Sequence, residues 1–184
     1  MTKLATAAWI AHNLGLSASF GGLLFGRLAL NPNLKVIDSE TERGKLLNTT
    51  WNRYNVVNAL SVGTAVATWF PGRLGLSGRA IDEQAQNLVR AKDILLLASV
   101  VTGLASMISG YMLSRQAPEG ATPIESGSEP APETPDRGVK LLRLVNVLGN
   151  VNLVLIGSIS AITTVLSMKA IESQRWSFVS RLLP

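Results

Sequence analysis

His12 is the only histidine in the chain, and the apolar stretch around it contains no acidic residue. A bis-histidine haem site or a three-histidine metal site needs more imidazoles, so we expect no metal ligands. A Ser-His-Asp arrangement needs a carboxylate beside the imidazole, and residues 4–26 contain none. The favoured role for His12 is a hydrogen-bonded interior group. Two alternatives stay open: an acid or base without a carboxylate, and an axial ligand to chlorophyll or haem, for which Ala8, Ala11 and Gly15 leave room.

Asparagine side chains form a second candidate site. If the helices alternate in direction, Asn58, Asn146 and Asn150 lie at one level of a helical bundle. This level also contains Asn55, Gly22 and Gly26, and it is bordered by Arg27 and Arg143. Amides inside a membrane bundle bond across helices or to carbonyls, each contributing about 0.6 kcal/mol on average. We favour that structural role, with a polar ligand-binding pocket as the alternative.

Four charge-free segments must position these residues: 4–26, 54–72, 94–114 and 144–168. Each is close to the roughly 20 residues that cross a hydrocarbon layer of about 30 Å. The sequence therefore predicts an all-α polytopic membrane protein, one domain over residues 1–184, with spans at about 4–30, 54–70, 94–114 and 144–168. Short connections favour an antiparallel four-helix transmembrane bundle.

Small and polar residues form a stripe along the first span at spacings of four and three. Its members are Ala8, His12, Gly15, Ser19, Gly22 and Gly26. In lipid, small residues mark places where helix backbones approach closely, so we expect this first-helix stripe to face the bundle interior. All twelve carboxylates lie outside the charge-free spans, which argues against a buried acidic proton relay.

The connecting segments carry turn and capping signals. Asn31-Pro32-Asn33 predicts a turn, and Ser39 with Glu42 predicts a helix cap. Pro71-Gly72 predicts the end of the second helix, and water-side helical extensions are expected at residues 38–53 and 79–93. Residues 116–137 are rich in Pro and Glu and predict a flexible loop, with a docking segment as the alternative. The amphipathic tail, residues 171–184, either lies at the headgroup level or continues the last helix.

The charge distribution argues against nucleic acid as a partner. The 17 Lys and Arg residues give a net charge of +5, but they lie at segment ends without a basic run. Contacts with lipid phosphates explain them better. The chain has no cysteine, which excludes disulfides and thiolate chemistry. A signal peptide is the alternative for the first segment, but the apolar run continues past residues 17–19, so we expect a retained helix.

The glycine-rich first helix, the Asn31-Pro32 turn and the Trp-Asn-Arg-Tyr sequence at residues 51–54 resemble the opening of several small four-helix bacterial membrane families. We expect localisation in the bacterial cytoplasmic membrane. The expected role is a non-catalytic structural or accessory subunit, with the lipid bilayer and other membrane protein subunits as partners. The alternatives are a small-molecule carrier that uses the inner polar layers, or a pigment- or haem-binding subunit through His12.

Overall fold

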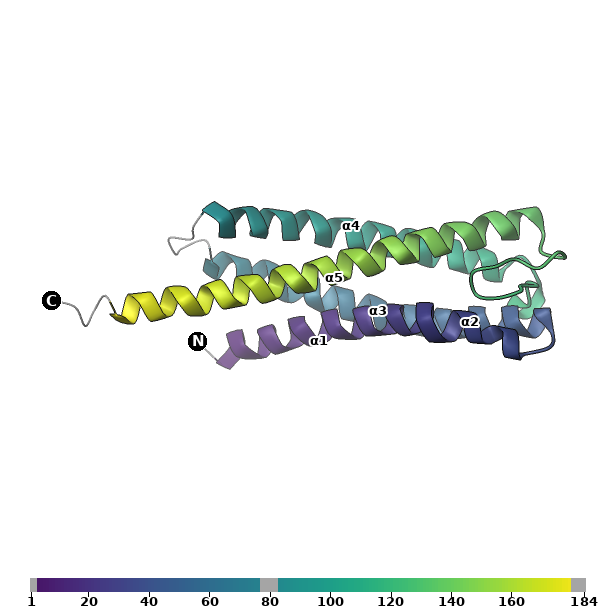
Figure 1. Ribbon diagram of the computed structural model, residues 1–184, viewed down its shortest axis with the longest axis horizontal. Helices are drawn as coiled ribbons and strands as arrows, with labels where there is room; N and C mark the ends of the chain where they lie inside the picture. Colours follow the sequence, from purple (N-terminus) through teal and green to yellow (C-terminus); the bar gives the residue numbers. More distant parts are fainter. Residues whose placement is uncertain (1–2, 77–82, 180–184) are drawn as a thin grey trace.

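The computed structural model describes the backbone of residues 3–76 and 83–179, with side chains between residues 4 and 70 and between 83 and 169. These residues form four long helices and no strand: α1 (Lys3–Phe25), α3 (Glu40–Leu76), α4 (Glu83–Ser114) and α5 (Asp136–Val179). Successive long helices run antiparallel (Figure 1). α1 packs along α3 and α4 along α5, and the α3–α4 and α1–α5 contacts close the bundle. The all-α prediction is confirmed.

The first-helix stripe faces the interior, as predicted. His12 and Ser19 are buried, and the stripe glycines allow α1 to approach α3 closely. A Cβ atom on Gly15 would lie 2.5 Å from the carbonyl oxygen of Ser61, which is too close for any side chain. A Cβ atom on Gly22 would lie 2.2 Å from the Tyr54 ring. The stripe is therefore the packing seam between α1 and α3.

The predicted turn at residues 31–33 was wrong, because the chain stays helical there. A π-helical segment (Gly26–Leu30), a short α2 (Asn31–Asn33) and a 3-10 turn (Leu34–Val36) continue α1. Pro32 lies in the first turn of α2, where the missing N–H of proline costs little. The predicted cap is confirmed: the Glu42 backbone N–H donates to Ser39 Oγ at 3.4 Å, and α3 begins at Glu40.

The prediction that Pro71-Gly72 ends the second helix was also wrong, since α3 continues to Leu76. A proline removes one helical hydrogen bond and can bend a helix without ending it. α5 continues without a break to Val179, so this part of the predicted tail extends the last helix. The predicted start of the second water-side extension at residue 79 lies outside the described residues.

The segment between α4 and α5, for which the composition predicts a flexible loop, makes several contacts with the bundle. It folds over the end of the bundle and includes a short 3-10 turn, η3 (Pro118–Gly120). Ile124 is 1% exposed and packs in a cluster with Leu34, Leu47 and Leu142. Three ion pairs join the segment to the start of α3 and the turn before it: Lys35–Glu129, Arg43–Glu125 and Lys45–Glu119. One buried apolar side chain and these polar contacts join the segment to the bundle end, and we call it the docked loop.

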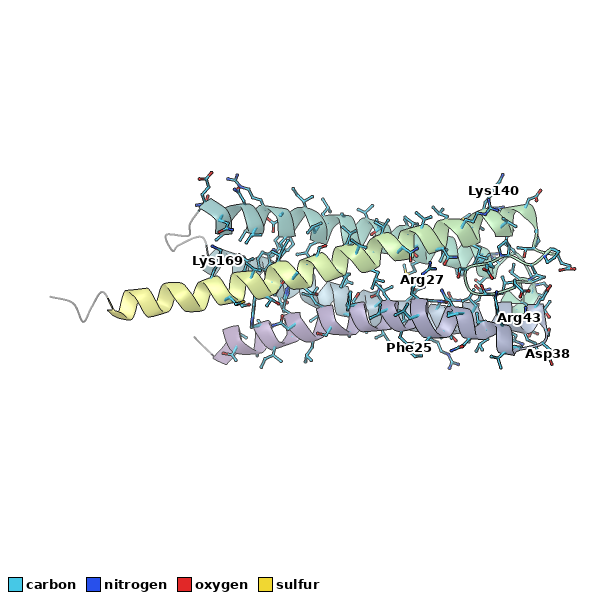
Figure 2. All side chains as sticks on the ribbon, in the orientation of Figure 1. Phe25, Arg27, Asp38, Arg43, Lys140 and Lys169 are labelled. Atoms are coloured by element: carbon cyan, nitrogen blue, oxygen red, sulfur yellow. The ribbon has the colours of Figure 1, made fainter. Side chains whose placement is uncertain are left out.

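Two helices of the described chain, over Glu83–Ser114 and Asp136–Lys169, are long and apolar enough to cross a membrane. Only 17% and 28% of their most apolar windows are buried, whereas the core helix of a water-soluble protein is mostly buried. Figure 2 shows Asp38, Arg43 and Lys140 at the end covered by the docked loop, and Phe25 pointing outward from α1. The helical core thus leaves much apolar surface uncovered.

Candidate functional site

His12 lies between α1, α3 and α4, where both of its ring nitrogens have partners. Nδ1 donates to the Ala65 carbonyl oxygen at 2.8 Å, which leaves Nε2 as the acceptor. The Lys92 ammonium donates to Nε2 at 2.9 Å. The Trp9 ring stacks on the imidazole with a centroid distance of 5.6 Å. Neither nitrogen is free to ligate a haem iron or a chlorophyll magnesium in this arrangement.

Lys92 is the residue that sequence reasoning missed. Residue 92 lies in the predicted water-side extension, yet its side chain is 0% exposed. Its ammonium lies 3.7 Å from the centroid of the Trp69 ring and 5.9 Å from that of Trp9, which are cation–π distances. Trp69 in turn donates from Nε1 to Asp93 at 2.8 Å. We call His12, Lys92, Trp9 and Trp69 the lysine cage.

A signal for the burial of Lys92 was present in the sequence. It lies four residues after Leu88 and seven before Ser99, so it shares a helical face with both. Leu88 packs against the core and Ser99 is buried. A lysine on the inner face of a helix needs a partner inside the bundle, and His12 supplies an acceptor.

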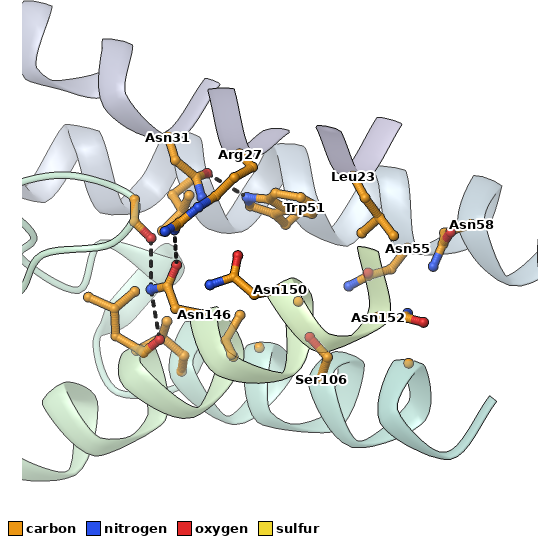
Figure 3. A pocket seen from close by; sticks show the side chains of 18 of the residues that line it. Leu23, Arg27, Asn31, Trp51, Asn55, Asn58, Ser106, Asn146, Asn150 and Asn152 are labelled. Carbon is orange, nitrogen blue, oxygen red and sulfur yellow. Dashed lines mark hydrogen bonds between the residues drawn. The ribbon is translucent and has the colours of Figure 1, made fainter. Parts of the chain in front are cut away.

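The second candidate site is a cavity of about 80 Å³ between the four helices, toward the docked loop (Figure 3). That volume holds several water molecules or part of a small ligand. Leu23 and Arg27 line it from α1 and the adjoining π-helical segment, and Trp51 lines it from α3. Its amide side chains come from α2, α3 and α5: Asn31, Asn48, Asn52, Asn55, Asn58, Asn146, Asn150 and Asn152. We call this space the asparagine cavity.

The structure brings together all three predicted asparagines around this cavity. Asn146 accepts from the Arg27 guanidinium at 3.3 Å and donates to the carbonyl oxygens of Leu142 and Gly127. Asn58 accepts from Ser19 Oγ at 2.6 Å. Asn150 points toward the same space in Figure 3 and makes no hydrogen bond with any described residue. The predicted common level is therefore present, and its amides are only partly used in packing.

Asn152 carries the clearest unsatisfied group of the described chain. The residue is 2% exposed, and its Oδ1 is buried without a hydrogen-bond partner. It lines the asparagine cavity and also a neighbouring space of about 160 Å³ between α3 and α4. Asn55, Asn58 and Gly103 line both spaces as well. The sequence prediction did not include Asn152 among the site residues.

The electrostatics of the asparagine cavity are set by Arg27. It is the only charged residue in the lining, and it forms no ion pair with any residue that the structure describes. No group of three His, Asp or Glu residues in the described ranges could hold a metal ion. The chemistry that this site offers is hydrogen bonding by neutral amides beside one guanidinium.

Fold and site together define an all-α four-helix protein with a filled lysine cage in one half and an amide-lined cavity in the other. Comparison with known proteins finds no matching family model, no similar curated protein and no similar solved structure.

Proposed function

We propose that this chain is an integral protein of the bacterial cytoplasmic membrane in which all four helices cross the bilayer. Large apolar side chains are exposed on every helix, among them Leu14 (65%), Leu60 (68%), Leu97 (67%) and Val154 (68%). The interior holds polar side chains among its apolar ones, including His12, Ser19, Lys92 and Asn152. Apolar outside and polar or small inside is the distribution that lipid favours.

Membrane fractionation tests this proposal. The chain should stay in the membrane pellet after an alkaline carbonate wash and be released only by detergent. Release into the aqueous fraction, with a monodisperse folded chain in buffer alone, would contradict it.

We further propose that the bundle binds a small polar molecule in the asparagine cavity. The observation that supports this most directly is the unpaired Oδ1 of Asn152, because a buried acceptor without a donor costs about 1–3 kcal/mol. A ligand that donates a hydrogen bond there removes that cost. Asn150 and Asn55 offer further amides on the same lining, and neither is hydrogen-bonded to a residue that the structure describes. The proposed function is thus that of a carrier or binding protein, without catalysis.

Extraction of the purified protein tests the binding function. The full chain in mild detergent should release a stoichiometric small molecule on denaturation, detected by mass spectrometry. Asn152→Leu keeps the branched side-chain shape and the number of heavy atoms but removes the acceptor, so it should lose that molecule. The matched control is Asn13→Leu, because Asn13 is an exposed asparagine of α1 outside the cavity. A cavity occupied by water alone, with no molecule released from the wild-type protein, would contradict the proposal.

Association with other membrane subunits is a second candidate function. The same exposed apolar side chains that face lipid could be covered by partner helices, and the docked loop presents Glu119 and Glu129 at the bundle end. This function predicts co-purifying membrane proteins in mild detergent. A monodisperse monomer that retains a small molecule would favour the binding function instead.

A further inference from the structure

Arg27 selects the charge of the ligand. Its guanidinium donates to Asn146 Oδ1 and keeps further donors free, with no acidic residue in the cavity lining. Guanidinium groups bind phosphate and carboxylate oxygens through paired, charge-assisted hydrogen bonds. An anionic group therefore fits the Arg27 end of the cavity better than a cation or an uncharged group.

Asn152 favours a hydrogen-bond donor at the other end of the ligand. Its free Oδ1 needs a donor, and an anionic oxygen cannot supply one. Asn152 lies six residues beyond Asn146 on α5, which corresponds to about 9 Å along the helix axis. A ligand that meets both groups must carry an anionic end and, a few ångströms away, a hydroxyl or another neutral donor.

Arg27 lies at nearly the same height along the bundle as two other arginines, Arg53 and Arg143. Gly26 packs against Trp51, and the next residue, Arg27, contacts Asn146. Residues 26 and 27, Trp51 and Asn146 therefore lie at about the same height along the bundle. Arg53 and Arg143 lie two and three residues from that height on α3 and α5, and both are exposed. Exposed apolar side chains flank Arg27, including Phe25 and Leu28. Basic residues beside apolar surface are typical of the lipid headgroup region.

We propose that the asparagine cavity binds a polyol phosphate, with its phosphate at Arg27 and a hydroxyl group at Asn152. This inference rests on the binding function proposed above. Such a group occurs both free, as glycerol phosphate, and on a lipid, as the headgroup of phosphatidylglycerol. The chemistry of recognition is the same in both cases.

Native mass spectrometry of the full chain in mild detergent separates these sources. Four probes are offered: phosphatidylglycerol, glycerol phosphate, phosphatidylcholine and diacylglycerol. The first two carry both a phosphate and a hydroxyl group, and at least one of them should be retained. Phosphatidylcholine lacks the hydroxyl and diacylglycerol lacks the phosphate, so each should bind at least about tenfold more weakly.

Two variants test whether Arg27 and Asn152 contact the ligand. Arg27→Gln and Asn152→Leu should each weaken binding of the retained probe by about tenfold or more. Arg53→Gln is the matched control, because Arg53 is exposed at nearly the same height and does not line the cavity. Arg27 is exposed, so its replacement spares the core and keeps the test valid if Asn152→Leu unfolds.

Equal retention of phosphatidylcholine or diacylglycerol would overturn the inference, as would equal losses in Arg27→Gln and Arg53→Gln. If the wild-type protein retains another molecule that Asn152→Leu loses, the binding function stands and the polyol phosphate does not. Retention of no small molecule by the wild-type protein would contradict both.

Discussion

The two polar regions of the bundle interior differ in whether their hydrogen-bonding groups have partners. In the lysine cage, His12 uses both ring nitrogens, and Lys92 has a ring acceptor with two tryptophan faces around it. In the asparagine cavity, Asn152 Oδ1 is buried without a partner beside an unfilled space. A buried polar side chain thus marks a site only where its hydrogen bonds are unmet and space remains.

The largest loss of stability is expected when the hydrogen bond between His12 and Lys92 in the lysine cage is removed. His12→Leu removes the acceptor of a fully buried ammonium, so it should lower the free energy of unfolding by about 3 kcal/mol or more. Thermal unfolding of the detergent-solubilised protein measures this loss.

Asn152→Leu is the counterpart in the asparagine cavity. It removes an unsatisfied acceptor, so stability should change by less than about 0.5 kcal/mol or should rise. Similar losses of stability in His12→Leu and Asn152→Leu would remove the distinction between the two regions.

A smaller effect is expected at the seam that holds α1 against α3. Gly15→Ala places a Cβ atom against the Ser61 carbonyl oxygen and should destabilise the protein by about 1–3 kcal/mol. Gly21→Ala on the same helix meets no atom within 4 Å and should be neutral or stabilising by up to about 1 kcal/mol. Chemical denaturation of both variants measures the difference, and equal stabilities would show that the seam is not tight.

The docked loop closes one side of the asparagine cavity through Gly127. A Cβ atom at residue 127 would lie 2.5 Å from Asn31 Cβ, so Gly127→Ala should displace the loop. Ligand retention should fall by about tenfold or less, with little loss of global stability. The adjacent Ser128→Ala is the control, because only the backbone N–H of Ser128 is hydrogen-bonded there. Unchanged retention in Gly127→Ala would exclude the loop as a wall of the site.

The smallest effect is expected from acid. Lys45 and Lys35 lower the pKa of Glu119 and Glu129, respectively, by hydrogen bonding. Their contribution to docking is present above the ordinary carboxyl pKa and is lost as the pH falls through the lowered values. Glu40 opposes this trend, because a hydrogen bond with Glu133 raises its pKa, and its contribution is lost as the pH rises.

Pepsin cleavage within residues 116–135 measures this loosening. The rate should rise, relative to an unfolded peptide of the same sequence, as the pH falls below about 4. The change should be modest because the pairs are exposed. Lys45→Gln should reproduce part of it at higher pH, and a rate independent of pH would contradict the role of the ion pairs.

The helices, the first-helix stripe and the shared level of Asn58, Asn146 and Asn150 could be predicted because they follow from local periodicity and helix direction. The burial of Lys92 could not, because its partner His12 is 80 residues away and the cage forms only when three helices meet. The contacts of the docked loop could not be predicted from its composition, because Ile124 packs against Leu34 and Leu142, which are distant in the sequence. The sequence could not single out Asn152, because the absence of a hydrogen-bond partner at its Oδ1 is visible only in the structure.

A crystal structure of the wild-type protein, purified with its lipids, would show whether the asparagine cavity is a binding site. We expect ordered non-protein density within hydrogen-bond distance of Asn152 Oδ1 that extends toward Arg27. A cavity filled by rearranged side chains, with Asn152 Oδ1 bonded inside the protein and no other density, would contradict it.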